Sequence, residues 1–191
     1  MELVFATHNQ NKFEEVLPLM PKHIKLLSLD MINCFDEIEE TGATLEENAR
    51  IKADFVTKNY GYNCFADDTG LLVDVLKGAP GVFSARYAGP KKNADANMDK
   101  LLIELKPHKN RDARFQTTIA LNLHEQTHIY NGEVLGKIIT TKRGSKGFGY
   151  DPIFIPESYD KTFAELPLSI KNKISHRGKA INSLIDFLST L

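Results

Sequence analysis

Phe65-Ala66-Asp67-Asp68-Thr69-Gly70-Leu71-Leu72-Val73 is the stretch that decides the fold of this 191-residue chain. Its apolar ends are typical of a buried strand that leads into a second strand. Neighbouring side chains of a regular strand point to opposite faces, so Asp67 and Asp68 should have different surroundings. A buried carboxylate without a partner costs several kcal/mol. Two interpretations follow. Either one carboxylate faces a metal ion or water while the other fixes the backbone, or the pair caps a tight Asp-Thr-Gly turn.

Strand and helix patterns alternate on both sides of this stretch, which predicts an α/β architecture. Strands are expected at residues 3–6, 26–29, 113–123 and 129–140, and helices from 12, 45–60, 94–105 and near 181–188. Pro18 should kink or end the first helix. The chain contains no internal repeat, low-complexity tract or linker, so we expect a single domain over residues 1–191.

Composition excludes several classes of protein. Charged residues make up 26% of the chain, and the net charge of −1 gives no reason to expect nucleic acid or a membrane surface as a partner. No apolar run approaches membrane-spanning length, and the N-terminus lacks the features of a signal peptide. Cys34 and Cys64 are too few for a zinc cluster or a disulfide framework. We therefore expect a protein of the reducing cytoplasm.

The segment Thr7-His8-Asn9-Gln10-Asn11-Lys12 connects the first strand to the first helix. A strand–loop–helix unit presents unpaired backbone N–H groups that favour an anion, and Lys12 adds a full positive charge. The pattern is not a Walker A loop. It indicates either a phosphate site or an asparagine-rich connector with a solvated lysine.

Two further features precede the central stretch. Glu40 ends an acidic run just before a Thr-Gly turn, where a carboxylate is either solvated or directed at a cation such as Mg²⁺. Thr44-Leu45-Glu46-Glu47 is a capping-box pattern that predicts the start of a long helix. Lys52 lies on that helix, either facing phosphate or as an ordinary surface lysine.

Two further stretches with candidate ligand-binding residues follow the central stretch. Residues 143–154 combine three glycines with Phe148 and Tyr150, which favours a loop that approaches a flat ligand. Lys171, His176 and Arg177 then place three hydrogen-bond donors close together before the last helix. His176 is either a structural histidine or a group that reads a carbonyl edge of a base.

Taken in order, these motifs resemble the inosine/xanthosine triphosphate pyrophosphatase family. The resemblance rests on residues 7–12, 40–42, 47–49, 66–71, 78–81, 84–87, 147–152 and 175–178, and it covers almost the whole chain. It implies a central mixed, elongated sheet flanked by helices, with two lobes around a nucleotide-binding cleft, and a homodimer. It also implies a Mg²⁺-dependent hydrolysis of ITP, dITP, XTP and dXTP to the monophosphate and pyrophosphate.

The resemblance also assigns roles to residues. Asp68 matches the general base, and Glu40 and Asp68 match the metal-binding acids. The substrate-binding set is Thr7, His8, Asn9, Gln10, Asn11, Lys12, Lys52, Thr69, Phe148, Gly149, Tyr150, Asp151, Lys171, His176 and Arg177. Within it, residues 7–12 and Lys52 match the triphosphate site, and Phe148–Asp151, Lys171, His176 and Arg177 match the base site.

Two positions depart from the family pattern. His8 replaces the usual glycine and does not adopt positive φ as cheaply, which affects the expected loop shape. Thr69 replaces serine and keeps the hydroxyl. Two alternative functions stay open: a house-cleaning pyrophosphatase for modified pyrimidine triphosphates, and a nucleotide sensor without catalysis.

Overall fold

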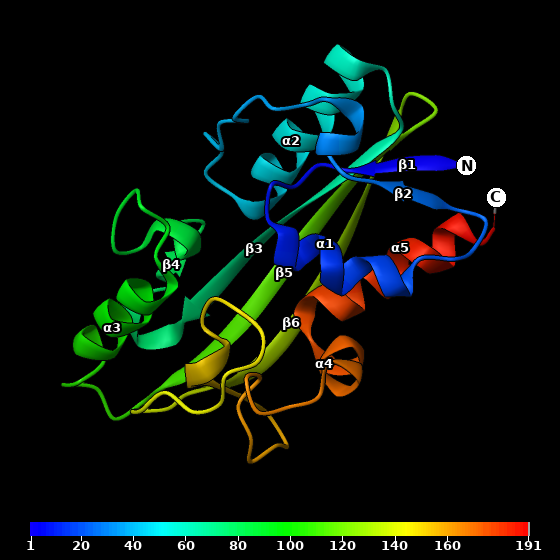
Figure 1. Ribbon diagram of the computed structural model, residues 1–191. Helices are drawn as coiled ribbons and strands as arrows, with labels where there is room; N and C mark the ends of the chain where they lie inside the picture. The colour runs from blue at the N-terminus through cyan, green and yellow to red at the C-terminus, as the bar shows by residue number, and fades with distance from the viewer. Residues whose placement is uncertain (191) are drawn as a thin grey trace. The chain divides into compact units, whose positions relative to one another are not determined.

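The strands pair in one seven-stranded mixed sheet in the computed structural model, which describes residues 1–190 (Figure 1). The strand order is β2-β1-β3-β5-β6-β7, with β4 paired to β3. Strands β1 and β2 and strands β1 and β3 are parallel, whereas β3–β4 and β6–β7 are antiparallel. Helices lie beside the sheet, which confirms the predicted α/β class with a mixed sheet.

The strands are β1 (Glu2–Phe5), β2 (Lys25–Leu27), β3 (Cys64–Val73), β4 (Pro80–Gly81), β5 (Asp112–Leu123), β6 (Gln126–Ile138) and β7 (Phe154–Pro156). The α-helices are α1 (Gln10–Val16), α2 (Leu45–Tyr60), α3 (Ala94–Glu104), α4 (Leu168–Ile174) and α5 (His176–Leu188). Residue contacts divide the chain into two compact units. Unit 1 contains Met1–Asp68, Thr117–Gly132 and the segment that begins at Arg177, and unit 2 contains Thr69–Gln116 and Glu133–His176.

Unit 1 has apolar layers on both faces of its strands. Leu3 and Phe5 of β1 pack in one buried cluster with residues of α1 and α5, whereas Val4 packs in another with residues of α2. This alternation is the period of two expected of a strand with both faces covered. Phe65 of β3 follows the same rule, because it stacks on Phe5 with ring centroids 4.5 Å apart. Phe65 and its neighbour Ala66 therefore pack in different apolar clusters, one on each face of the strand.

The helix ends of unit 1 follow local sequence signals. Helix α2 has the predicted capping box between Thr44 and Glu47, and it ends at Gly61, whose φ is 74°. Helix α1 begins at Gln10, two residues before the predicted start, because the Asn9 side chain accepts hydrogen bonds from the backbone N–H groups of Asn11 and Lys12. Pro18 follows the end of α1 in a short 3₁₀ turn, so it ends that helix.

The core of unit 2 forms where α3 packs against β3, β5 and β7. Met98 and Leu101 of α3 are buried with Phe115, Phe154 and Phe163. The apolar residues Met98 and Leu101 of α3 are therefore part of the core.

The turn between β5 and β6 is tighter than predicted. It consists of His124 and Glu125, both at positive φ, as in a two-residue type I′ turn. Strand β6 therefore begins at Gln126, three residues before the predicted position, because histidine and glutamate are weak sequence signals for this turn type.

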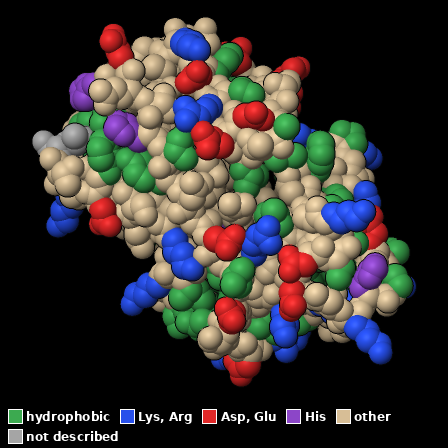
Figure 2. All heavy atoms as spheres, turned by 180° about the vertical axis from the view of Figure 1, so that it is seen from behind, with side chains coloured by type: hydrophobic (Ala, Val, Ile, Leu, Met, Phe, Trp, Pro, Cys, Tyr) green, Lys and Arg blue, Asp and Glu red, His purple; other side chains and the backbone are tan. Residues whose placement is uncertain are grey.

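The charged surface shows no large area of one sign on the face drawn in Figure 2, where Lys and Arg side chains lie among Asp and Glu side chains. This agrees with the net charge of −1. Among residues 1–190, no helix has both the length and the apolar character that crossing a bilayer requires.

Candidate active site

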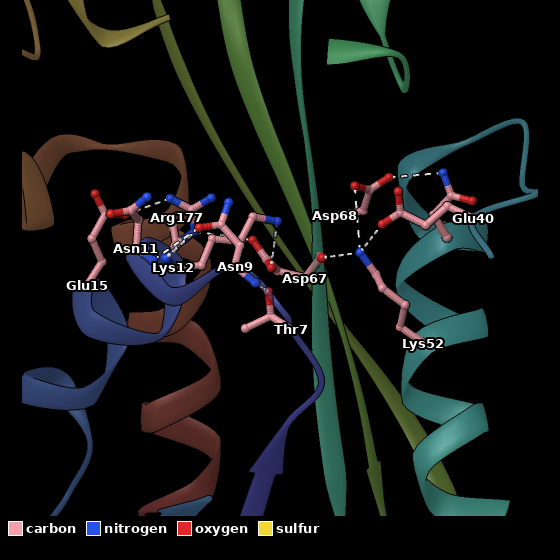
Figure 3. Close-up of polar contacts among 11 residues, drawn as sticks. Thr7, Asn9, Asn11, Lys12, Glu15, Glu40, Lys52, Asp67, Asp68 and Arg177 are labelled. Carbon is pink, nitrogen blue, oxygen red and sulfur yellow. Dashed lines mark hydrogen bonds and ion pairs between the residues drawn. The ribbon is translucent and has the colours of Figure 1, made fainter. Parts of the chain in front are cut away.

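Asp67 of β3 is the centre of a buried ion-pair network in unit 1 (Figure 3). Its side chain is 1% exposed; Oδ1 lies 2.9 Å from Lys12 Nζ, and Oδ2 lies 3.2 Å from Arg177 Nε. Burial alone would raise the pKa of Asp67, but the charges of Lys12 and Arg177 outweigh it and hold that pKa well below its usual range. The Asp67 carboxylate therefore pairs with two cations, Lys12 and Arg177.

Lys12 reaches this network from the first turn of α1. Asn9 caps the helix, and the Asn9 backbone N–H donates to Thr7 Oγ1 at 3.1 Å. Burial lowers the pKa of Lys12, and the charge of Asp67 opposes that change. The side chains of Gln10 and Asn11 are exposed. The segment from Thr7 to Lys12 thus combines an ordered backbone with one half-buried cation.

Glu15 completes the network and was missed by the sequence analysis. Its Oε2 lies 2.7 Å from Arg177 Nη1, and both side chains are at most 11% exposed. Burial alone would lower the pKa of Arg177, but the charges of Asp67 and Glu15 raise it. The sequence signal that could have identified Glu15 is its position beside Val16 on the apolar side of α1, where a buried carboxylate needs a partner. The resemblance assigns Arg177 to base recognition, whereas its ion pairs here are with Asp67 and Glu15.

Lys52 of α2 approaches β3 from the other side. Its Nζ lies 2.5 Å from Glu40 Oε1, 2.8 Å from the Asp67 backbone oxygen and 3.8 Å from Asp68 Oδ1 (Figure 3). Burial alone would lower the pKa of Lys52, but the charges of Asp68 and Glu40 outweigh it and raise that pKa. Lys52 is buried, so the interpretation as an ordinary surface lysine is wrong.

Asp68 has different partners from Asp67. Its Oδ2 accepts a hydrogen bond from Asn48 Nδ2 at 3.1 Å. Burial raises the pKa of Asp68, and the charge of Lys52 opposes this only in part. Asn48, a second residue that the sequence analysis did not single out as functional, also accepts from the backbone N–H of Gly42 at 2.8 Å. A Cβ at Gly42 would lie 2.7 Å from Asn48 Oδ1, so glycine is required for this close contact.

The donor set of unit 1 fits a Mg²⁺ ion. Glu40 and Asp68 direct their carboxylates at one cationic point, the Lys52 ammonium group. Among residues 1–190, no group of three or more His, Cys, Asp or Glu side chains is placed to hold a metal ion. Mg²⁺ in phosphate-processing sites typically takes one or two carboxylates and completes its shell with water and substrate phosphate. Two acids are therefore sufficient for such an ion and insufficient for a closed protein cage.

Unit 2 contains a second cluster, formed by the glycine-rich segment and α4. Lys171 Nζ lies 2.6 Å from Asp151 Oδ2, and both side chains are 5% exposed. The same carboxylate oxygen accepts from the Phe148 backbone N–H at 2.9 Å, and the ammonium group lies 5.1 Å from the Phe148 ring centroid. A Cβ at Gly147 would lie 2.0 Å from Asp151 Oδ2, so a side chain there would displace that carboxylate.

Aromatic contacts hold the remaining residues of this cluster. The His176 ring stacks on Phe115, with centroids 4.6 Å apart and an interplanar angle of 14°, and it is 3% exposed. The Tyr150 hydroxyl donates to the Ser84 backbone oxygen at 2.8 Å. Gly149 adopts a φ of 64°, and Thr69 is half-buried in β3. The structure thus brings Phe148, Asp151 and Lys171 together and buries His176 among aromatic rings.

His8, the departure from the family pattern, introduces no left-handed backbone, because it is not among the residues with positive φ. Its ring Nε2 lies 2.9 Å from the backbone oxygen of Asp36. The loop therefore forms with histidine in place of glycine and gains a contact to another segment.

Comparison with known proteins gives matches over the full length. The family model described as the Ham1 family matches residues 3–187. A dITP/XTP pyrophosphatase of Flavobacterium johnsoniae is 59% identical over 99% of this chain and 98% of its own length. A dITP/XTP pyrophosphatase of Bacillus subtilis is 47% identical over 98% of this chain and 96% of its own.

Solved structures of Ham1 proteins have the same fold as this chain. A HAM1 protein from Coxiella burnetii is 40% identical, with a TM-score of 0.92 over 100% of both chains. The Staphylococcus aureus Ham1 protein is also 40% identical, with a TM-score of 0.88 over 100% of this chain and 99% of its own. On the family-model match and these full-length relatives, this chain belongs to the Ham1 family.

Proposed function

We propose that this protein hydrolyses the triphosphates of deaminated purines, dITP, ITP, XTP and dXTP, to the nucleoside monophosphate and pyrophosphate. Relatives that are 47% and 59% identical over their full lengths are named dITP/XTP pyrophosphatases. The structural observation that carries the proposal is the grouping of two lysines with three acids around one strand. Lys12 donates to the Asp67 side chain, and Lys52 donates to the Asp67 backbone oxygen. The carboxylates of Glu40 and Asp68 form ion pairs with Lys52.

The chemistry follows from these charges. In NTP + H₂O → NMP + pyrophosphate, a bond forms between the water oxygen and the α-phosphorus, and the bond from that phosphorus to the bridging oxygen breaks. Negative charge grows on the leaving pyrophosphate, and in this proposal the positive charges of Lys12 and Lys52 offset it. Residues from Thr7 to Lys12 contact the triphosphate in this proposal.

Asp68 acts as the general base, accepting the proton of the attacking water. Burial raises the pKa of Asp68, so its carboxylate is a stronger base than an exposed one. Glu40 and Asp68 would hold Mg²⁺, which supplies charge neutralisation on the phosphate oxygens. Asn48 keeps Asp68 in place through the 3.1 Å hydrogen bond.

Unit 2 supplies recognition of the base. Lys171 and His176 are hydrogen-bond donors beside the Phe148 and Phe163 rings, on which a purine can stack. Hypoxanthine and xanthine present a 6-oxo acceptor, whereas adenine presents an amino donor that would leave a buried donor unpaired, at about 1–3 kcal/mol. Phe148, Gly149, Tyr150 and Asp151 form the wall of this site, and Thr69 contacts substrate from β3. For Arg177, the ion pairs with Asp67 and Glu15 support a role in holding Asp67 instead of reading the base.

The protein acts as a homodimer, as the family resemblance implies, and in the reducing cytoplasm, as its composition with only two cysteines predicts. Its charge balance supports small-molecule substrates in preference to nucleic acid. The pyrimidine-triphosphate and sensor alternatives are not favoured, because the full-length relatives are named dITP/XTP pyrophosphatases. A screen of purified protein with common, deaminated and modified pyrimidine triphosphates, with detection of pyrophosphate, tests the proposal. Turnover greatest with dITP and XTP supports it, and equal turnover of dATP or modified dUTP overturns it.

A further inference from the structure

His8, within the segment from Thr7 to Lys12 that we call the triphosphate loop, makes a contact to a distant part of the chain. Its ring Nε2 lies 2.9 Å from the backbone oxygen of Asp36, 28 residues further along the chain and within the same unit. A carbonyl oxygen only accepts, so Nε2 carries the proton and donates. The His8 side chain is exposed and its backbone is unstrained, so this hydrogen bond is separable from the core.

Asp36 is held from a second direction. The hydroxyl of Tyr60, the last residue of α2, donates to Asp36 Oδ2 at 2.7 Å. This hydrogen bond is the main reason that the pKa of Tyr60 is raised. Asp36 therefore lies between the loop that follows β1 and the end of α2, with one hydrogen bond to each.

The segment fixed in this way carries Glu40. Residues 34–42 form neither helix nor strand, and Glu40 follows Asp36 by four residues. Beyond Glu40, the Gly42 backbone N–H donates to Asn48. A chain of irregular backbone loses conformational freedom when it is ordered, and a contact made before ligand binding reduces what remains to be lost. His8 and Tyr60 thus hold the chain on one side of Glu40 and Asn48 holds it on the other, while the Glu40 carboxylate pairs with Lys52.

From these contacts we infer that His8 is a positioning residue: its imidazole fastens the Glu40 segment to the triphosphate loop and so preorganises Glu40 for the divalent cation. This inference deepens the proposed function and rests on it for the identity of the cation site. The replacement of glycine by histidine at position 8 is, in this view, a gain of a contact between two loops of one site.

The first test uses hydrogen exchange in the full chain without metal. His8→Ala removes the donor, and backbone amides of residues 37–42 should exchange about two- to tenfold faster than in the wild type, the range expected for one neutral hydrogen bond. His8→Gln keeps an N–H donor of similar reach and should restore part of the protection. His108→Ala, at an exposed histidine of unit 2, is the matched control and should leave these amides unchanged.

The second test measures the Mg²⁺ concentration that gives half-maximal pyrophosphate release from dITP. This concentration should rise about two- to tenfold in His8→Ala, because the variant loses one hydrogen bond that holds the Glu40 segment. Tyr60→Phe, which removes the other contact of Asp36, should shift the half-maximal concentration in the same direction.

Amide exchange and Mg²⁺ dependence that are identical in His8→Ala and the wild type would overturn the inference. A wild-type protein that releases no pyrophosphate at any Mg²⁺ concentration would instead overturn the proposed function, and the exchange of residues 37–42 in the metal-free variants would still decide whether His8 fastens this segment.

Discussion

Asp67 and Asp68 are neighbours in β3, yet their carboxylates bind different groups: Asp67 pairs with Lys12 and Arg177, whereas Asp68 bonds to Asn48 and lies 3.8 Å from Lys52. The alternation of side chains along a strand separates them. Their pKa values consequently move in opposite directions, down for Asp67 and up for Asp68. The Asp67 carboxylate is held by two cations, whereas the Asp68 carboxylate has only partial compensation for its burial.

Asp67→Asn is expected to destabilise the protein strongly. The neutral amide leaves the buried Arg177 and the half-buried Lys12 with less compensating charge. Breaking a buried ion pair by removing one partner typically costs about 3–5 kcal/mol. Urea unfolding at pH 7 measures this free energy. A loss below about 1 kcal/mol, the level of exposed ion pairs, would contradict the buried network.

The pH dependence of the same variant gives an independent check. A carboxyl whose pKa is depressed in the folded state stabilises the fold above its unfolded pKa, near 3.8, and loses that contribution as the pH falls further. The difference in unfolding free energy between wild type and Asp67→Asn should therefore be constant near neutral pH and shrink below pH 3.8. If this difference in unfolding free energy grew on acidification, the pKa of Asp67 would be raised in the folded state and not lowered.

Asp68→Asn is expected to keep the fold and lose turnover. Because the folded-state pKa of Asp68 is raised, its ionised form lowers stability at neutral pH, so removal of the charge should leave the urea midpoint unchanged or higher. Loss of a general base lowers the rate typically by about 10²- to 10⁴-fold. Steady-state kinetics with dITP provide the measurement, and wild-type kcat in a folded Asp68→Asn protein would remove Asp68 from the mechanism.

Gly147→Ala should displace the Asp151 carboxylate in unit 2, in addition to straining the backbone at position 147. Gly147 and Gly61 have φ values of 73° and 74°, so both alanine variants incur a left-handed penalty of about 1–2 kcal/mol. A Cβ at Gly61 meets nothing within 4 Å, whereas one at Gly147 lies 2.0 Å from Asp151 Oδ2. KM for dITP should rise in Gly147→Ala and not in Gly61→Ala; equal KM values in the two variants would show that Asp151 need not stay in place.

Cys64 should resist thiol reagents in the native protein. It is fully buried in β3, and burial raises the pKa of its thiol, which suppresses the reactive thiolate. Cys34 is also completely buried. We expect labelling by a thiol reagent only after unfolding in urea, with both cysteines then modified. Rapid labelling of Cys64 in native buffer would contradict its described burial.

Local signals in the sequence predicted the elements well, and long-range pairings limited prediction of the site. The capping box at Thr44 and Glu47 fixed the start of α2, because its partners are three residues apart. Lys52 stayed ambiguous, because burial comes from contacts with Glu40 and Asp67, 12 and 15 residues away.

The longest pairings were least accessible to sequence reasoning. Arg177 meets Asp67 across 110 residues and Glu15 across 162, and no periodicity records such a contact. The family resemblance supplied Arg177 as a site residue, but it did not predict that Asp67 and Glu15 would hold the guanidinium group.

Product analysis tests the central claim most directly. Purified protein is incubated with dITP and Mg²⁺, and the products are separated, with Asp68→Asn as the control. We predict dIMP and pyrophosphate in equal amounts, formed much faster than dAMP from dATP, and almost none with Asp68→Asn. Release of dIDP and orthophosphate, or equal rates with dITP and dATP, would contradict this account.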